Sequence, residues 1–265
     1  AMQDLKAQDA KQKVAKLMAA GYSIPESDAL GMLGDAHPTN YAENREFFLN
    51  QNSPTNFERT WTTAYFLYKK INAVTEQTPF DQVMDFSVIQ KLGSEPKYSS
   101  QKNEYDTHFA PTTAGAIQGE KDEILTKTVV IHFFPNSWDL NKKVTRNADG
   151  KEVEELYDPN VGFIVEEVGK LAGQYGAARI VIEGHSDGSM KGQVPKSLVQ
   201  ELSMNRANAV KEALVKKFTS LEPNQFAATG LGWDRPADPA DPDNGAKNRR
   251  VEIKVYPAEA TPAAK

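Results

Sequence analysis

The sequence predicts an α+β fold, in which a mixed sheet of β-α-β-α-β order has its helices on one face and an all-α helical region precedes it. Three observations predict this. The first third of the chain has apolar residues at helical spacing and no alternating strand pattern. The last half alternates short β-branched runs with helical segments. A polar stretch rich in Ser, Thr, Gly and Pro separates them and is typical of a linker. The predicted parts are a helical region (1–92), a linker (93–126), a sheet domain (127–258) and a disordered tail (259–265).

The helical region is predicted to contain five helices, punctuated by Pro and Asn. The first carries Leu5, Val14, Leu17 and Met18, and the second opens at Ser27. The other three are expected at 41–49, 56–71 and 81–92. Six aromatic residues here have helical spacing, which favours a hydrophobic core over a carbohydrate-binding platform: Phe47, Phe48, Trp61, Tyr65, Phe66 and Tyr68.

The sheet domain is predicted from alternating strand and helix patterns. Strands are expected at 128–134, 179–183 and 251–256, with a further short strand at 226–230, and helices at 160–175 and 202–218. Between Leu140 and Pro159, the dipeptide Asp149-Gly150 is flanked by short alternating segments. This pattern predicts an additional hairpin.

An acid and a cation fall at the ends of two of these elements. The apolar run 180–182 is followed by a glycine-bounded turn that contains Asp187, while Ser203 is the expected N-cap of the helix whose first turn holds Arg206. A cation there opposes the helix dipole, at a cost of about 0.3–1 kcal/mol, unless an anion shares the site. That anion could be Asp187 or a ligand carboxylate. Free backbone N–H groups at the helix start would add to anion capture, and Asp187 could accept hydrogen bonds from a ligand ammonium. Together these groups suit a zwitterion.

The same residues belong to five short motifs in a fixed order. They read FFPNSWDL (133–140), GHSD (184–187), LSMNRA (202–207), GLG (230–232) and NRRV (248–251). In this order they resemble the OmpA-like peptidoglycan-binding domain, and five ordered motifs are far more specific than one short signature.

This resemblance implies a non-catalytic domain that holds the diaminopimelate side chain of the peptidoglycan stem peptide. Asp187 and Arg206 stand at the family's two principal ligand positions, and Asn136 is a third contact. Ser203 and, at the rim, Arg249 complete the candidate set. The chain departs from the family at Val199, where Asn is frequent, and in a longer loop before Leu202. The resemblance also implies a periplasmic, cell-wall-associated protein of Gram-negative type, with outer-membrane association as a further option.

The helical region resembles a second family through looser motifs. They read VAKLMAAGYS (14–23), YAENREFF (41–48), WTTAYF (61–66) and FSVI (86–89). They are similar to the C-terminal helical part of ABC-transporter solute-binding proteins of the nitrate, sulfonate and taurine type. This implies a parent protein that joins solute capture to cell-wall attachment and has a transporter permease as a partner. Such proteins bind solute between two α/β lobes that are missing here, so this region alone is expected to bind no small solute.

Composition excludes several classes of function. The net charge of −5, without a basic stripe, argues against a general nucleic-acid binder, and the absence of cysteine removes disulfides, thiolate catalysis and cysteine–zinc sites. No run approaches the roughly 18 apolar residues of a membrane span. No signal peptide opens the chain at Ala1-Met2, so we expect the tail of a longer secreted precursor.

Each candidate residue also has an alternative, purely structural interpretation. Asp187 and Arg206 could form a simple structural ion pair, Asn136 could cap its loop, and His185 is expected to bond the backbone. Asn248, Arg249 and Arg250 could brace the last strand.

Catalysis and metal binding are not expected. Adjacent His185, Ser186 and Asp187 cannot easily align as a triad, so no enzyme activity and no cofactor are predicted. The acidic loop at Asp238, Asp241 and Asp243 misses the EF-hand spacing. The remaining alternative is a solute-binding-protein fragment whose OmpA-like domain serves protein–protein interaction.

Overall fold

The computed structural model describes residues 8–34, 37–104, 107–120, 122–148, 151–257 and 261–262. They form two compact units. The first holds the described residues up to 50 together with 56–104, and the second holds 51–55 together with the described residues from 107 onward. Leu5 of the predicted first helix lies outside the described residues.

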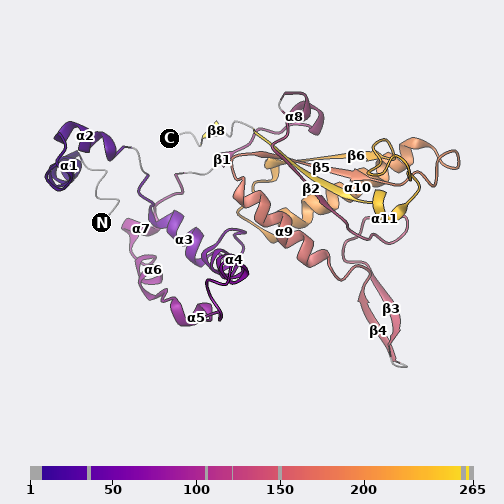
Figure 1. Cartoon of the computed structure of the whole chain (residues 1–265), viewed down its shortest axis with the longest axis horizontal. Helices are drawn as coiled ribbons and strands as arrows, with labels where there is room; N and C mark the ends of the chain where they lie inside the picture. Colours follow the sequence, from indigo (N-terminus) through magenta and orange to yellow (C-terminus); the bar gives the residue numbers. More distant parts are fainter. Residues whose placement is uncertain are drawn as a thin grey trace. The chain divides into compact units, whose positions relative to one another are not determined.

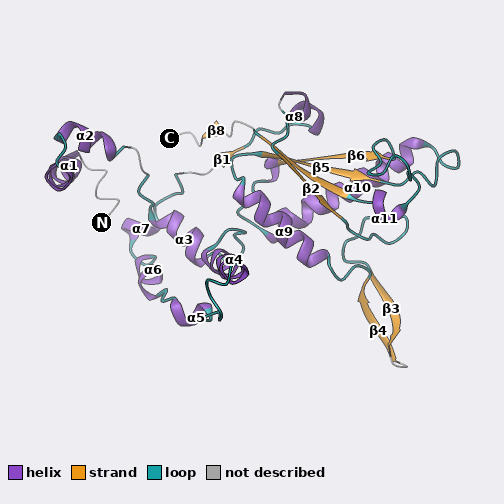
Figure 2. Ribbon diagram, in the orientation of Figure 1, coloured by secondary structure: helices purple, strands orange, loops and turns teal. Residues whose placement is uncertain are grey.

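The first unit is helical, as predicted, and its described residues form no strand (Figures 1 and 2). Its helices are α1 (Gln8–Tyr22), α2 (Glu26–Met32), α3 (Tyr41–Leu49), α4 (Phe57–Lys70), α5 (Phe80–Val83), α6 (Ser87–Leu92) and α7 (Pro96–Ser99). Two of them begin at predicted breaks because an asparagine caps each one. The Asn40 side chain accepts from the Glu43 N–H in a capping box, and the Asn56 side chain accepts from the Arg59 N–H.

The helix predicted at 81–92 is two helices. Met84 has extended backbone angles (φ −115°, ψ 128°), which end α5. The Asp85 carboxylate then accepts a hydrogen bond from the N–H of Ser87 (2.8 Å), which restarts the chain as α6. The apolar periodicity continues through the break, so the sequence pattern did not reveal it.

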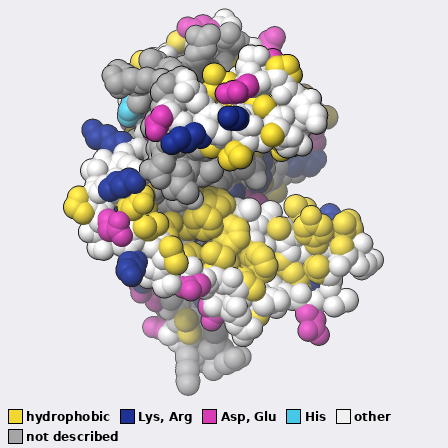
Figure 3. All heavy atoms as spheres, turned by 90° about the vertical axis from the view of Figure 1, so that its left-hand side faces the viewer, with side chains coloured by type: hydrophobic (Ala, Val, Ile, Leu, Met, Phe, Trp, Pro, Cys, Tyr) yellow, Lys and Arg dark blue, Asp and Glu magenta, His cyan; other side chains and the backbone are white. Residues whose placement is uncertain are grey.

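The aromatic residues of this unit are only partly a core. The rings of Phe47, Phe48 and Phe57 pack within 4.9–5.6 Å of one another. However, Phe66 is 61% and Tyr68 55% exposed, and α4 has no buried residue. The prediction that all six aromatics are core residues is therefore wrong for Phe66 and Tyr68, and Phe47 is also 37% exposed although its ring contacts Phe48 and Phe57. Hydrophobic side chains also gather on the face of the molecule shown in Figure 3.

The second unit is built on a four-stranded mixed sheet of order β2-β7-β5-β6. Its strands are β2 (Leu125–Val129), β5 (Arg179–His185), β6 (Phe226–Gly232) and β7 (Val251–Tyr256). β5 runs parallel to β6 and antiparallel to β7, which also pairs with β2. The two long helices α9 (Val161–Gln174) and α10 (Lys196–Lys217) pack on one face, as predicted (Figure 2).

The core lies between these helices and the sheet. Alternate residues of β5 point to opposite faces, so Ile180 and Ile182 meet the helices while Val181 and Glu183 face the other way. The helices contribute the fully buried side chains of Val168, Val210 and Leu214, and Phe218 directly after α10 closes this core.

The opposite face is partly covered by a short helix, α8 (Ala114–Glu120). Its Ala114 and Ile117 pack with Val181, Ala227 and Tyr256. The polar stretch 93–126, predicted as a linker, thus contains α7, β1 (Thr107–His108), α8 and the start of β2. Only two apolar residues of α8 face the sheet, too few for a periodic signal.

Several smaller elements complete the unit. β2 begins and ends earlier than the predicted strand 128–134, so residues 130–134 continue as a loop. The predicted hairpin is present as β3 (Lys143–Ala148) and β4 (Lys151–Leu156), which extend away from the sheet in Figure 1. Its turn at Asp149-Gly150 lies outside the described residues.

A 3₁₀ turn (Pro223–Gln225) precedes β6, and α11 (Gly245–Asn248) precedes β7. Within the predicted tail, β8 (Thr261–Pro262) pairs with β1, and the other positions from 259 onward lie outside the described residues. Among the helices that the structure describes, none is long and apolar enough to cross a membrane.

Candidate ligand-binding pocket

A pocket of about 800 Å³ opens where β5 ends and α10 passes beside it. Its walls come from the loop after β2, the turn after β5, the first half of α10 and the segment around α11. Four of the five predicted ligand residues line it: Asn136, Asp187, Arg206 and Arg249. The structure therefore brings together groups that are up to 113 positions apart in the sequence.

Asp187 is fixed by the turn that follows β5. The Ser186 N–H donates to the Gly232 carbonyl (2.7 Å), and the Gly188 N–H donates to the Pro242 carbonyl (2.8 Å). The buried carboxylate of Asp187 accepts from the N–H of Ser189 (3.1 Å) and from its hydroxyl, and it pairs with the Nε–H of Arg249. Burial raises the pKa of Asp187, but the hydrogen bonds from Arg249 and Ser189 outweigh it and hold the pKa below its ordinary value. Asp187 is therefore ionised at neutral pH.

Arg206 reaches the pocket from the middle of α10 and is buried. Its Nε–H donates to the Ser137 carbonyl (3.1 Å), and its guanidinium carbon lies 4.9 Å from the centre of the Phe133 ring. Within the described part of the chain, its two terminal nitrogens form no hydrogen bond. Burial, and next the charge of Arg249, lower the pKa of Arg206 to about 10, while Asp187 acts in the opposite direction. The Arg206 guanidinium is thus charged and fixed in position, and the N–H groups of its two terminal nitrogens remain available as donors to a ligand.

Asp187 and Arg206 do not pair with each other. The sequence left open a simple ion pair between them, but Arg249 is the ion-pair partner of Asp187, and its own side chain is 59% exposed. The roles of Phe133 and Ser137 were missed, although both belong to the FFPNSWDL motif. The motif is a local strand and loop pattern, so it does not indicate that its residues will contact the distant Arg206.

Ser203 does not have the predicted role. α10 begins at Lys196 after Pro195, so Ser203 lies well inside the helix, and the predicted N-cap with free N–H groups at Leu202 is wrong. Leu198 and Leu202 share one helical face, which allows the helix to start earlier. The fully buried Ser203 hydroxyl donates to the Gln200 carbonyl (2.9 Å) and accepts from the Gly232 N–H (2.9 Å). Its observed role is to join α10 to the end of β6.

Ser203→Ala is therefore expected to destabilise the fold by about 1–3 kcal/mol, because it leaves the Gly232 N–H buried without a partner. Urea denaturation measures this, with exposed Ser197→Ala on the same helix as the control. Equal stability of the two variants would contradict the assigned role.

Asn136 lines the pocket with a left-handed backbone (φ 54°), a conformation that Asn tolerates better than most residues. The loop is capped by its neighbours instead. The Ser137 hydroxyl accepts from the Asp139 N–H (3.1 Å), and the Asp139 carboxylate accepts from the Asn141 N–H (2.9 Å). The alternative that Asn136 caps this loop is therefore wrong.

His185, Ser186 and Asp187 are not arranged as a catalytic triad. The Nε2 of His185 lies 3.6 Å from Glu183 and 3.7 Å from Glu252, whereas Asp187 pairs with Arg249. The predicted backbone hydrogen bond of the His185 ring is not formed to any described residue.

The fold and the pocket define a mixed-sheet domain with a charged pocket at the end of β5. Residues 154–250 match the model of the OmpA family, and this segment is therefore an OmpA family domain. The chain is 32% identical over 116 residues to outer membrane protein Omp38 of Acinetobacter baumannii, covering 43% of this chain and 30% of that protein. It is 37% identical over 98 residues to outer membrane porin F of Pseudomonas fluorescens, covering 37% of this chain and 28% of that protein. The chain thus spans less than a third of each relative.

The comparison with solved structures gives matches of low TM-score, two of which follow. The peptidoglycan-associated lipoprotein from Burkholderia pseudomallei is 22% identical, with a TM-score of 0.32, over 46% of this chain and 95% of that one. The OmpA-like domain of FopA1 from Francisella tularensis is 16% identical, with a TM-score of 0.34, over 62% of this chain and 99% of that one.

Proposed function

We propose that the second unit binds peptidoglycan without catalysis, by holding the diaminopimelate of the stem peptide. The observation that carries this proposal is the buried Arg206, whose terminal nitrogens have no acceptor among the described residues and which lines the same pocket as the Asp187 carboxylate. The OmpA family match of residues 154–250 supports it, as does the likeness to a protein named for its association with peptidoglycan.

The two charged groups at the end of the diaminopimelate side chain have complementary partners in the pocket. The side-chain end of diaminopimelate carries an ammonium and a carboxylate on one carbon. Arg206 offers a planar fork for the carboxylate, a geometry that gives strong, bidentate hydrogen bonds. Asp187 accepts from the ammonium, which takes the place of the exposed Arg249 on that carboxylate. Apolar side chains of the lining, among them Leu202 and Val199, cover the methylene chain.

The pocket should distinguish two stem peptides. A lysine-type peptide has the ammonium but no side-chain carboxylate, so Arg206 would remain without its anion. Charge-assisted hydrogen bonds contribute about 1.5–3 kcal/mol each, so the diaminopimelate peptide is expected to bind at least about tenfold more tightly. Calorimetric titration of the protein with both purified peptides measures the ratio.

Sedimentation with purified sacculi provides the companion test. The wild-type protein is expected to sediment with them, Asp187→Ala is expected to lose binding, and no soluble fragments should appear. Equal affinity for the two stem peptides, or release of fragments from the sacculi, would contradict the proposal.

In the wider proposal, this domain attaches an exported, periplasmic protein to the cell wall. The relatives named as outer membrane proteins support an envelope location. The resemblance of the helical region to part of a solute-binding protein, and the solute capture and permease partner that it implies for the parent protein, stay predictions from the sequence.

A further inference from the structure

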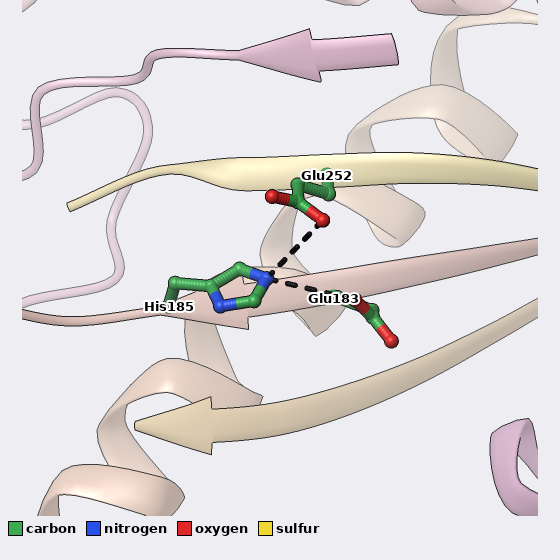
Figure 4. A group of neighbouring side chains, drawn as sticks. All are labelled: Glu183, His185 and Glu252. Carbon is green, nitrogen blue, oxygen red and sulfur yellow. Dashed lines mark ion pairs between the residues drawn. The ribbon is translucent and has the colours of Figure 1, made fainter. Parts of the chain in front are cut away.

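Three ionisable side chains converge on the sheet face opposite α9 and α10 (Figure 4). Glu183 and His185 are two positions apart on β5, so both point to this face, and Glu252 is the direct partner of Glu183 on β7. The Nε2 of His185 lies 3.6 Å from Oε2 of Glu183 and 3.7 Å from Oε2 of Glu252. Figure 4 shows the imidazole nitrogen directed at both carboxylates.

The cluster holds buried polar atoms without partners. Glu183 is fully buried and His185 is 2% exposed. Within the described part of the chain, both ring nitrogens of His185 lack a hydrogen-bond partner, whereas Oε2 of Glu183 forms an ion pair with Lys254 at 3.3 Å. Buried polar atoms are nearly always satisfied, so a buried Nε2 that lies between two carboxylates without a hydrogen bond indicates a partner from outside the chain.

The donor set suits a transition-metal ion. The three ligand atoms lie within 4.8 Å of one another, and one imidazole nitrogen with two carboxylate oxygens is a set that Zn²⁺ accepts. Tetrahedral coordination at about 2.1 Å places donor atoms about 3.4 Å apart. The two distances from His185, 3.6 and 3.7 Å, need only small shifts to reach that spacing, and the two carboxylate oxygens lie within 4.8 Å of each other, so they would close in on a bound ion. A fourth position stays open.

Neighbouring groups orient both carboxylates. Oε1 of Glu183 accepts from the Gln118 amide (2.6 Å), and Oε1 of Glu252 pairs with Arg250 (2.6 Å). Each Oε2 is thereby turned towards His185. Outer hydrogen bonds of this kind are what hold metal ligands in place. Arg235 also lies 3.6 Å from Oε1 of Glu183.

Lys254 is the competing cation. Its ammonium lies 3.3 Å from Oε2 of Glu183 and 3.8 Å from Oε2 of Glu252. It also lies 3.2 Å from Glu123, which offers an alternative partner once the two other carboxylates are occupied. A divalent ion can therefore replace the ammonium without leaving it unpaired.

We propose that Glu183, His185 and Glu252 form a binding site for a divalent transition-metal ion of the Zn²⁺ class, with the Lys254 ammonium as the counter-ion that the metal displaces. Asp187 and Arg206 take no part in this site, although His185 also lines the pocket proposed to bind peptidoglycan. The sequence predicted no metal, since Glu252 joins the other two only through the strand register.

Titration of the metal-stripped full chain with ZnCl₂, followed by calorimetry and thermal unfolding, tests this proposal. One equivalent is expected to bind and to raise the melting temperature. His185→Gln removes a ligand and is expected to lower the affinity by more than about 100-fold, since loss of an outer-shell partner alone costs 10–100-fold. Asp241→Asn, in the exposed acidic loop, is the control for adventitious binding and should leave the titration unchanged.

Lys254→Met is the second variant, and it keeps the test decisive if His185→Gln fails to fold. Without zinc it should melt at a lower temperature, because the buried Glu183 and the partly buried Glu252 lose a counter-ion. With zinc it should bind about tenfold or more tightly than the wild type, because the competing charge is gone. The proposal would be overturned if no site binds one equivalent of zinc, or if His185→Gln or Lys254→Met binds zinc with wild-type affinity. Loss of zinc binding in Asp241→Asn would also overturn it.

Discussion

Arg206→Met is expected to abolish the binding of diaminopimelate-containing stem peptide and the retention of the protein on sacculi. Methionine keeps an unbranched apolar side chain beside Phe133 but removes the guanidinium fork. Two charge-assisted hydrogen bonds at about 1.5–3 kcal/mol each correspond to a loss of at least about 100-fold in affinity. Calorimetric titration with the purified peptide measures the loss.

Two companion variants make this result specific. Arg146→Met removes an exposed arginine of the β3–β4 hairpin, which does not line the pocket, and should bind like the wild type. Arg206→Lys keeps the charge but cannot form the bidentate fork, so its affinity should fall between those of the wild type and Arg206→Met. Wild-type binding by Arg206→Lys would show that charge alone suffices and would contradict the proposed geometry.

Gly184→Ala should cause the largest loss of stability among single-methyl additions near the site. A Cβ at position 184 would overlap with the backbone carbonyl of Ser203, so β5 and α10 would have to separate. Overpacking of this kind costs about 1–3 kcal/mol and sometimes more. Because α10 carries Arg206, peptide affinity should fall as well. Urea denaturation followed by circular dichroism measures the stability.

Gly162→Ala is the matched control. A Cβ at this position in α9 meets no atom within 4 Å. Alanine in a helix is favoured over glycine by about 0.5–1 kcal/mol, so this variant should be as stable as the wild type or more so. If Gly184→Ala unfolded at the same urea concentration as Gly162→Ala, the close approach of β5 and α10 would be contradicted.

Local patterns in the sequence predicted the order of strands and long helices of the second unit, because each depends on periodicity within one segment. They failed where two local signals competed. Ser203 had the form of an N-cap, yet Pro195 and the apolar face through Leu198 start α10 earlier. α8 was missed because only Ala114 and Ile117 pack against the sheet.

The candidate site was predictable as a set of residues but not as a set of contacts. The ordered motifs named Asn136, Asp187, Arg206 and Arg249, and all four line one pocket. That Asp187 pairs with Arg249 depends on how α11 approaches the end of β5, which no local pattern encodes. The convergence of Glu252 on His185 likewise depends on the register of β7 against β5.

The central claim is that Arg206 and Asp187 together bind the charged end of diaminopimelate. Its most direct test is a crystal structure of the protein bound to a diaminopimelate-containing stem tripeptide. We predict that the side-chain carboxylate of the ligand lies within hydrogen-bond distance of both terminal nitrogens of Arg206, with the neighbouring ammonium on the Asp187 carboxylate in place of Arg249. A tripeptide bound outside this pocket, or held in it without contact to Arg206, would contradict the account.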